Sequence, residues 1–398
     1  MTYDNPNIKQ EEKTKKLKIL HILLLIVIAV THVNCNEMEN KKYEWLPGRC
    51  APQMYPVSIV YGYFSSEEKY IASVPRGILV DNGWGKQGSI EVVGPDLKTL
   101  PDELFIEWFS FTENKFYKGT FSLPKDTIAS LMEQGFPVID RRLHQTYNCI
   151  SVGLAPGGRV VVWLLSSDGW ATEVGHYQAE ETTRTLESFL GELRTWGWVQ
   201  ELDMDPKDVT QEDFRNSFLY KNKFSTAGRH LDSIQGKIPF GLWDKYREKF
   251  LFRVRMDYDD PNAMTDRIKS EYYNGEEEYM QIYPQNDNGF KKRARIRFFN
   301  TYWSFGRTLQ ETTVMMDETE LMEAYNTLYE GNPDREIELR VHVNKENDFI
   351  RLWLSDPHAE YSRELELTKA YIKIYPVSET LRHQYLIFRE EFKDMYNQ

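Results

Sequence analysis

Several residue patterns that mark common enzymes are missing from this chain of 398 residues. It contains no H-E-x-x-H, G-x-S-x-G or C-x-x-C sequence, and its eight histidines never flank a helical Glu at a spacing of four. These motifs hold a catalytic zinc ion, expose a nucleophilic serine or form a reactive thiol pair. We therefore predict no catalytic residue, no cofactor and no metal ion. A hydrolase whose site is assembled from distant positions is an alternative that motifs do not test.

The chain also lacks an excess of positive charge: it has 49 Lys and Arg against 61 Asp and Glu, which gives a net charge of −12. Phosphate contacts dominate nucleic-acid binding, so charge of this sign argues against nucleic acid and against anionic membranes held by charge alone. A basic partner suits the charge better. We predict that the partner is a protein or another envelope ligand, with no nucleic acid involved.

The apolar run 19–30 is too short to span a bilayer, which takes about 20 helical residues. It follows a lysine cluster and has the length of a signal-peptide core. Cys35 comes soon after it, an order that resembles the lipobox of bacterial lipoproteins, in which the Cys is acylated. We expect a signal peptide over 1–34, lipidation of Cys35 and a tether over 35–44. A plain secretory signal and an uncleaved anchor are the alternatives.

Cysteine occurs only three times, at positions 35, 50 and 149. If Cys35 carries lipid, Cys50 and Cys149 are the only pair left for a disulfide in an oxidising compartment. Such a bond would close a loop of about a hundred residues and stabilise the fold by up to about 4–5 kcal/mol. Two buried free thiols are the alternative.

Aromatic residues are abundant, at 14% of the chain, and favour β-structure. The run 159–168 ends in Trp-Leu-Leu-Ser-Ser-Asp, and 348–356 ends in Trp-Leu-Ser-Asp. Each follows a turn and an alternating run, 149–154 or 337–343, so each predicts a β-hairpin. A hairpin that occurs twice indicates an internal repeat.

The other predicted elements also occur twice in the same order. A strand, a strand pair, a short helix and the hairpin precede a longer amphipathic helix in both halves. Apolar residues at helical spacing define these last two helices: Leu186, Phe189, Leu190, Leu193 and Trp196 in one, and Leu381, Tyr385, Phe388, Phe392 and Met395 in the other. We predict an α+β fold of two tandem similar modules, 45–199 and 240–398, each an antiparallel sheet backed by amphipathic helices, with a linker over 200–239.

Two local patterns suggest chemistry but favour plain turns. The sequence Gly83–Gly88 spells G-x-G-x-x-G, which binds dinucleotides only between a strand and a helix, and here a predicted strand follows it. Acidic residues at 257–260 and 276–278 offer oxygen ligands, yet their spacing fits no calcium loop. We predict a glycine turn and solvated acidic turns.

Large rings on predicted loops are the better candidates for binding, because Trp and Tyr dominate binding hot spots. The four candidate residues lie beside glycines or turn residues: Trp84, Trp170, Tyr272 and Tyr273. The alternative is that these rings fold back and cover the ends of the sheet.

A pattern of aromatic and turn residues runs through the first half: Trp45, Tyr55-Pro-Val, Tyr61-Gly-Tyr, Pro75-Arg-Gly, Trp84-Gly, Val93-Gly, Leu100-Pro, Trp108-Phe-Ser and Phe116-Tyr. It resembles the bacterial lipoproteins grouped as domain of unknown function 2931. The resemblance covers most of 45–200 and carries no catalytic signature. Some members of that family resemble immunity proteins against phospholipase effectors of type VI secretion.

From these observations we expect an exported, lipid-anchored, non-catalytic binding protein of the bacterial envelope, in the outer membrane or periplasm. Immunity against a secreted toxin is the most specific form of this expectation. A module that binds glycans or peptidoglycan is one alternative, and the hydrolase is the other.

Overall fold

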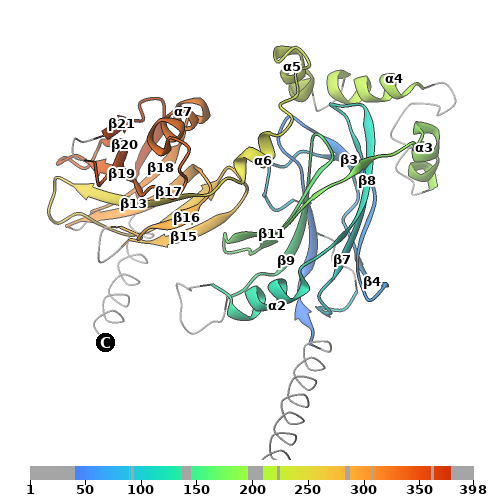
Figure 1. The fold of residues 1–398 in the computed structure, drawn as a ribbon, viewed down its shortest axis with the longest axis horizontal. Helices are drawn as coiled ribbons and strands as arrows, with labels where there is room; N and C mark the ends of the chain where they lie inside the picture. Colours follow the sequence, from blue (N-terminus) through green and yellow to red (C-terminus); the bar gives the residue numbers. More distant parts are fainter. Residues whose placement is uncertain are drawn as a thin grey trace, which may run out of the picture.

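The computed structural model describes residues 41–377, apart from 89, 91–93, 137–144, 196–208, 222–224, 283–286, 307 and 360–362. The predicted signal peptide, Cys35 and the last predicted helix around 381–395 therefore lie outside the described residues. Strands account for 46% of the structure and helices for 18%, so sheets form the framework. The prediction of several antiparallel sheets is confirmed. Figure 1 shows them in two lobes, one from each half of the chain.

The first half packs two sheets around one core. One sheet has the strand order β2-β9-β10-β11 and the other has the order β4-β3-β7-β8-β12, with β5 paired to β3. Alternate residues of a strand point to one face, so Val162 of β10 and Trp108 of β7 meet in the same core. The strands are β2 (Leu46–Cys50), β3 (Val57–Ser66), β4 (Lys69–Ser73), β5 (Gly77–Val80), β7 (Glu103–Ser110), β8 (Lys115–Ser122), β9 (Cys149–Ala155), β10 (Arg159–Leu165), β11 (Ala171–Gln178) and β12 (Glu180–Glu181), and β1 (Tyr43–Glu44) pairs with β6 (Leu97–Lys98).

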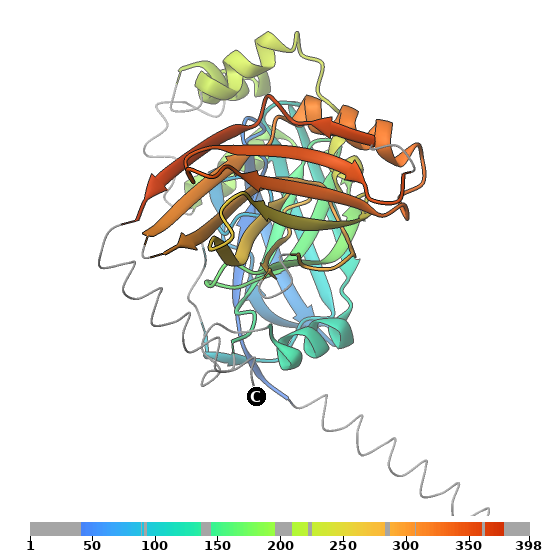
Figure 2. The same cartoon turned by 90° about the vertical axis from the view of Figure 1, so that its left-hand side faces the viewer.

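The second half also has two runs of strands, β16-β13-β19-β20-β21 and β15-β14-β17-β18-β22. Trp303 of β17 and Leu352 of β20 are both buried in its core. In Figure 2 the second half lies in front of the first half. Its strands are β13 (Phe250–Tyr258), β14 (Met264–Tyr272), β15 (Glu277–Gln281), β16 (Lys291–Arg293), β17 (Ile296–Phe305), β18 (Thr308–Met315), β19 (Ile337–Val343), β20 (Ile350–Asp356), β21 (Arg363–Glu366) and β22 (Tyr371–Pro376).

The strand orders of the two halves correspond. The series β2-β9-β10-β11 matches β13-β19-β20-β21, and β4-β3-β7-β8-β12 matches β15-β14-β17-β18-β22. Strand direction agrees too, because the pairs β2–β9 and β13–β19 are parallel while the other pairs named here are antiparallel. A bridge between Ala171 and Glu277 joins β11 to β15, so a single nine-stranded sheet runs through both halves.

Several predicted elements are confirmed. Both repeated hairpins form, as β9–β10 and β19–β20. The two short helices form as α2 (Lys125–Gln134) and α7 (Glu318–Tyr329), with Ile128 and Leu321 buried as predicted. The first amphipathic helix forms as α3 (Leu186–Thr195), and its Phe189 is fully buried.

The segment 200–239, predicted as a linker, contains helices that pack on the first half. They are α4 (Gln211–Asn216), the π-helical turn η2 (Ser217–Lys221) and α5 (Ser225–Ser233). Thr210 and Asp213 form a reciprocal capping box that satisfies amide groups at the start of α4. Phe214 of α4 and Phe189 of α3 join Phe109 and Phe116 in a cluster on the outer face of the six-stranded sheet that contains β7 and β8. Figure 1 shows α4 and α5 at the top of the first lobe and α3 at its right-hand side.

No helix within the described residues is long and apolar enough to span a membrane.

Candidate binding site

The glycine-rich turn Gly83–Gly88 lies against the second half of the chain. Gly83 and Gly85 have φ angles of +113° and +71°, a region that favours glycine. A Cβ atom added at Gly85 would lie 2.3 Å from the Cα atom of Gly275, so the two backbones touch directly. After the turn, Ile90 forms a single antiparallel bridge with Gly48, and no helix occurs among the described residues there to hold a pyrophosphate. The turn therefore has a structural role at the junction of the two halves.

Ion pairs reinforce this junction. Lys86 Nζ lies 2.7 Å from Glu271 and 2.5 Å from Glu277, both of the second half. A second ion pair has the charges exchanged: Glu173 of β11, in the first half, pairs with Arg247 of the second half at 2.6 Å. Burial raises the pKa of Glu173, although Arg247 opposes this shift. Burial also favours a higher pKa for Glu271. Its contacts with Lys86 and Arg297 outweigh burial and hold the pKa below the usual value.

An aromatic cleft of about 300 Å³ opens at the same junction. Both halves and the short helix α6 (Leu242–Tyr246) supply its rings. The Tyr55 and Trp243 rings meet edge to face at 5.2 Å, and the Tyr246 and Tyr273 rings lie 5.1 Å apart. Each of these rings, and that of Trp84, is less than one tenth exposed. We call this site the junction cleft, lined by Tyr55, Trp84, Trp243, Tyr246 and Tyr273.

Polar groups lie at the rim of the junction cleft. Glu318, the first residue of α7, accepts a hydrogen bond of 2.6 Å from the Tyr246 hydroxyl. Burial raises the pKa of all three cleft tyrosines, and the negative charge of Glu318 adds to the shift. These tyrosines are therefore neutral phenols at physiological pH. Trp84 Nε1 is buried and has no hydrogen-bond partner among the described residues.

The four aromatic residues predicted for binding are not exposed loop rings. Trp84 and Tyr273 line the junction cleft, and both are 7% exposed. Tyr272 is 4% exposed and donates a hydrogen bond of 2.6 Å to Glu278, within the core of the second half. Trp170 is half-buried and stacks on Phe136 at 5.0 Å. The structure thus brings two of the four together and packs the other two into the fold, which corrects the expectation of exposure.

The predicted disulfide between Cys50 and Cys149 is also corrected. Both residues are buried free thiols. The register of β2 and β9 places Cys50 opposite Gly153, four residues beyond Cys149. That offset corresponds to about 13 Å along the strand, whereas Cα atoms joined by a disulfide lie about 4.4–6.8 Å apart. Burial raises the pKa of each thiol to about 12, so neither is a reactive thiolate at neutral pH.

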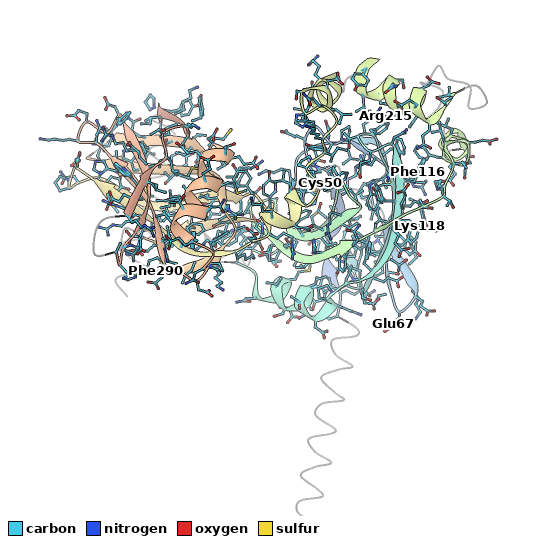
Figure 3. All side chains as sticks on the ribbon, turned by 45° about the horizontal axis from the view of Figure 1, so that its top comes forward. Cys50, Glu67, Phe116, Lys118, Arg215 and Phe290 are labelled. Atoms are coloured by element: carbon cyan, nitrogen blue, oxygen red, sulfur yellow. The ribbon has the colours of Figure 1, made fainter. Side chains whose placement is uncertain are left out.

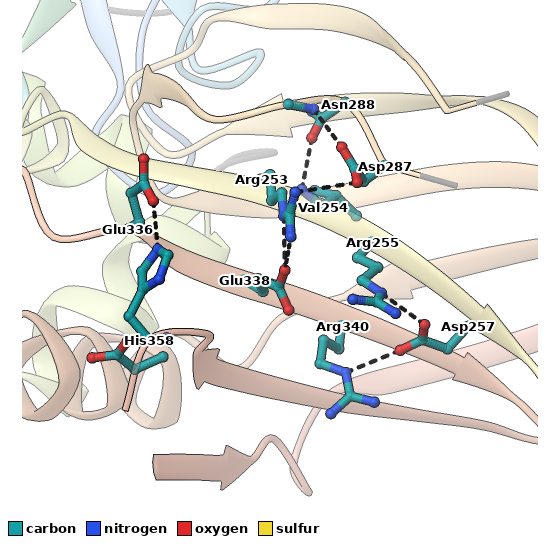
Figure 4. Close-up of polar contacts among 12 residues, drawn as sticks. Arg253, Val254, Arg255, Asp257, Asp287, Asn288, Glu336, Glu338, Arg340 and His358 are labelled. Atoms are coloured by element: carbon teal, nitrogen blue, oxygen red, sulfur yellow. Dashed lines mark hydrogen bonds and ion pairs between the residues drawn. The ribbon is translucent and has the colours of Figure 1, made fainter. Parts of the chain in front are cut away.

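Carboxylates in both acidic clusters pair with cations. Asp257 accepts from Arg255 and from Arg340, both at 2.9 Å, along the parallel strands β13 and β19. Figure 4 shows these bonds as part of a row that continues through Arg253 and Glu338. At the other cluster, Glu276, Glu277 and Glu278 pair with Lys249, Lys86 and Arg293. Across the described parts of the chain, no group of His, Cys, Asp and Glu is arranged to hold a metal ion.

A second surface was not predicted from the sequence. On β3 and β7, Tyr63 and Phe105 stand opposite each other on the face that points away from the core, and their rings stack at 5.3 Å. Tyr61 lies 5.5 Å from the Tyr63 ring, and Tyr70 of the edge strand β4 is 59% exposed. We call these four residues the tyrosine face. Its signal in the sequence is the alternation of Tyr61 and Tyr63 with core residues.

Charged groups lie beside the tyrosine face. The Arg76 guanidinium lies over the Tyr61 ring at 5.1 Å, a cation–π contact. Beside Phe105 a groove of about 420 Å³ continues over Lys118 and Thr120 toward Glu180. Figure 3 labels Lys118 on the side of the first lobe that points away from the second. This face is therefore separate from the junction cleft.

The first half of the chain matches a known family. Residues 31–215 align with the family model described as Protein of unknown function (DUF2931). Residues 31–215 belong to this family. The matched region ends in α4, so the family unit includes part of the helical layer as well as both sheets of the first half. No curated protein and no solved structure matches the chain.

Proposed function

We propose that this protein is an exported, lipid-anchored, non-catalytic binding protein of the bacterial envelope, and that its partner is a protein, specifically a secreted toxin. The tyrosine face carries this proposal. It presents three tyrosines and a phenylalanine, flanked by Arg76, on a sheet whose opposite face is packed into the core. Tyr and Arg are enriched where binding energy concentrates, and rings held by a sheet lose little entropy on binding.

We also propose that the two halves are copies of one ancestral unit. Their matching strand orders support this, and so do the two parallel pairs at corresponding positions. The family match covers residues 31–215, which include the first copy. The outer face of the second half, on β14, β15, β17 and β18, mixes polar residues with rings: Lys269, Asn300 and Glu311 lie there beside Tyr279 and Tyr302. In this view the first copy binds the partner and the second supports it.

The acidic charge and the family resemblance support the choice of partner. A net charge of −12 favours a basic protein through long-range attraction. Among relatives, the resemblance to immunity proteins points to phospholipase effectors, and the predicted lipid anchor would place the protein at the membrane such a toxin reaches.

The test is association with the product of an adjacent toxin gene. We expect the full chain to co-purify with that product, and the Tyr63→Ala, Phe105→Ala double variant to bind at least tenfold more weakly. Tyr371→Ala is the matched control, because Tyr371 is 58% exposed on β22 of the second half. If the wild-type chain and toxin fail to associate while the toxin is active, the proposed partner is wrong. Equal losses in the double variant and the control would instead exclude the tyrosine face.

A glycan is the second candidate ligand, because the stacked rings of Tyr63 and Phe105 also resemble a platform for a sugar ring. Titration with peptidoglycan fragments separates the two candidates. Saturable binding that Tyr63→Ala abolishes would favour the glycan over the toxin.

A further inference from the structure

We propose that the junction cleft is a second binding site, which takes a small cationic group, a protonated amine or a quaternary ammonium. The site is separate from the tyrosine face, and its existence does not depend on the identity of the protein partner. Its volume of about 300 Å³ lies at the lower end for ligand pockets, which favours a small ligand or a single side chain.

Aromatic rings form the body of the site. Two tryptophans and three tyrosines from both halves and from α6 surround the cleft. A ring presents a negative quadrupole to a cation over its face, and an array of rings is a known means of holding an ammonium group. Because burial keeps the tyrosines protonated, the rings attract a cation through their π systems without carrying formal charge.

The charges at the rim favour a cation over an anion. Lys86 and Arg297 also line the cleft, but Glu271 accepts contacts from both, at 2.7 and 2.8 Å, and Glu277 adds a second contact to Lys86. Glu318 is exposed, and among the described residues it forms no ion pair with Lys, Arg or His. It is therefore the one lining carboxylate left to meet an incoming cation. A ligand acceptor atom would also satisfy the unpaired indole N–H of Trp84.

The most direct test compares a cation with a neutral molecule of the same shape. The full chain is titrated with choline chloride and with 3,3-dimethylbutan-1-ol at constant ionic strength, followed by calorimetry and tryptophan fluorescence. We expect saturable binding of choline that is about tenfold tighter than that of the alcohol, in line with a cation–π contribution. Equal affinities, or no saturable binding of choline, would overturn the proposal.

Variants locate the site. Glu318→Gln keeps the shape and an acceptor for Tyr246 but removes the charge, and we expect it to weaken choline binding at least threefold. Glu187→Gln makes the same change on the exposed side of α3 and should leave binding unchanged. Thermal unfolding of each variant checks that it is folded, and the comparison of choline with the alcohol needs no variant. Unchanged affinity in a folded Glu318→Gln variant would contradict the assignment.

A third titration identifies the source of the cation. Nα-acetyl-lysine methylamide carries the ammonium of a protein side chain, whereas choline represents a free metabolite or a lipid headgroup. Tighter binding of the lysine derivative would assign the cleft to a basic side chain of a partner. Tighter binding of choline would assign it to a quaternary ammonium compound.

Discussion

Two glycines determine how closely the two halves approach. Gly85 and Gly275 meet backbone to backbone, and both have positive φ. The sequence shows Gly83–Gly88 as a turn, but only the folded chain shows what that turn touches. For the same reason the exposure of Trp84 and Tyr273 could not be predicted. Both residues stand on turns, and the other half of the molecule covers them.

Replacing Gly85 by Ala tests this contact. The added Cβ would lie 2.3 Å from Gly275, and the positive φ adds strain, so we expect a loss of about 2–4 kcal/mol in the free energy of unfolding. Gly94→Ala is the control, because Gly94 has φ +84° and no described residue lies within 4 Å of an added Cβ. It should lose about 1 kcal/mol. Urea unfolding measures both variants, and equal losses would mean that the halves do not pack here.

The carboxylate of Glu271 makes stability depend on pH. Lys86 and Arg297 lower its pKa in the folded state below the ordinary value of 4.5, despite the opposing effect of burial. Such a group stabilises the fold above its unfolded pKa, and this contribution disappears as the pH falls through the folded pKa. We expect the free energy of unfolding to decrease below about pH 4.5 more steeply in wild type than in Glu271→Gln. Parallel pH profiles from urea unfolding would contradict this.

At the scale of elements, the spacing of apolar residues in the sequence correctly predicted both hairpins and three of the helices, α2, α3 and α7. The hairpins were identified from strand alternation at 149–154 and 337–343, and helices from the helical spacing at Ile128 and Leu321. Each of these elements buries an apolar face that can be read from its own short stretch of sequence. The helices α4 and α5 were not predicted, since their apolar residues lie within a polar stretch. For α4 and the η2 turn that follows it, the available signal was the spacing of Phe214, Phe218 and Leu219.

Phe214→Ala tests whether α4 belongs to the folded core of the first half. Phe214 is fully buried among aromatic residues, so we expect a loss of about 3–5 kcal/mol. Phe240→Ala changes the same residue type where it is 62% exposed, and it should lose less than about 0.5 kcal/mol. The measurement is again urea unfolding of the full chain. A loss for Phe214→Ala as small as that for Phe240→Ala would show that α4 acts only as a linker.

At the scale of the whole molecule, the two candidate binding surfaces lie apart: the junction cleft lies between the halves, and the tyrosine face lies away from the junction. The junction cleft needs both halves, whereas the tyrosine face belongs to the first half alone. The sequence could indicate that aromatics would bind, because they are abundant and stand on turns. It could not show which rings remain open, since that depends on which face of the sheet the helices cover.

Hydroxyl-radical footprinting of the full chain, with and without the adjacent toxin, tests the binding role most directly because it reports the solvent access of individual rings. We predict that oxidation of Tyr61, Tyr63, Tyr70 and Phe105 falls at least threefold in the complex, while oxidation of the exposed Tyr371 is unchanged. A stable complex in which those four rings remain as reactive as in the free protein would contradict the account.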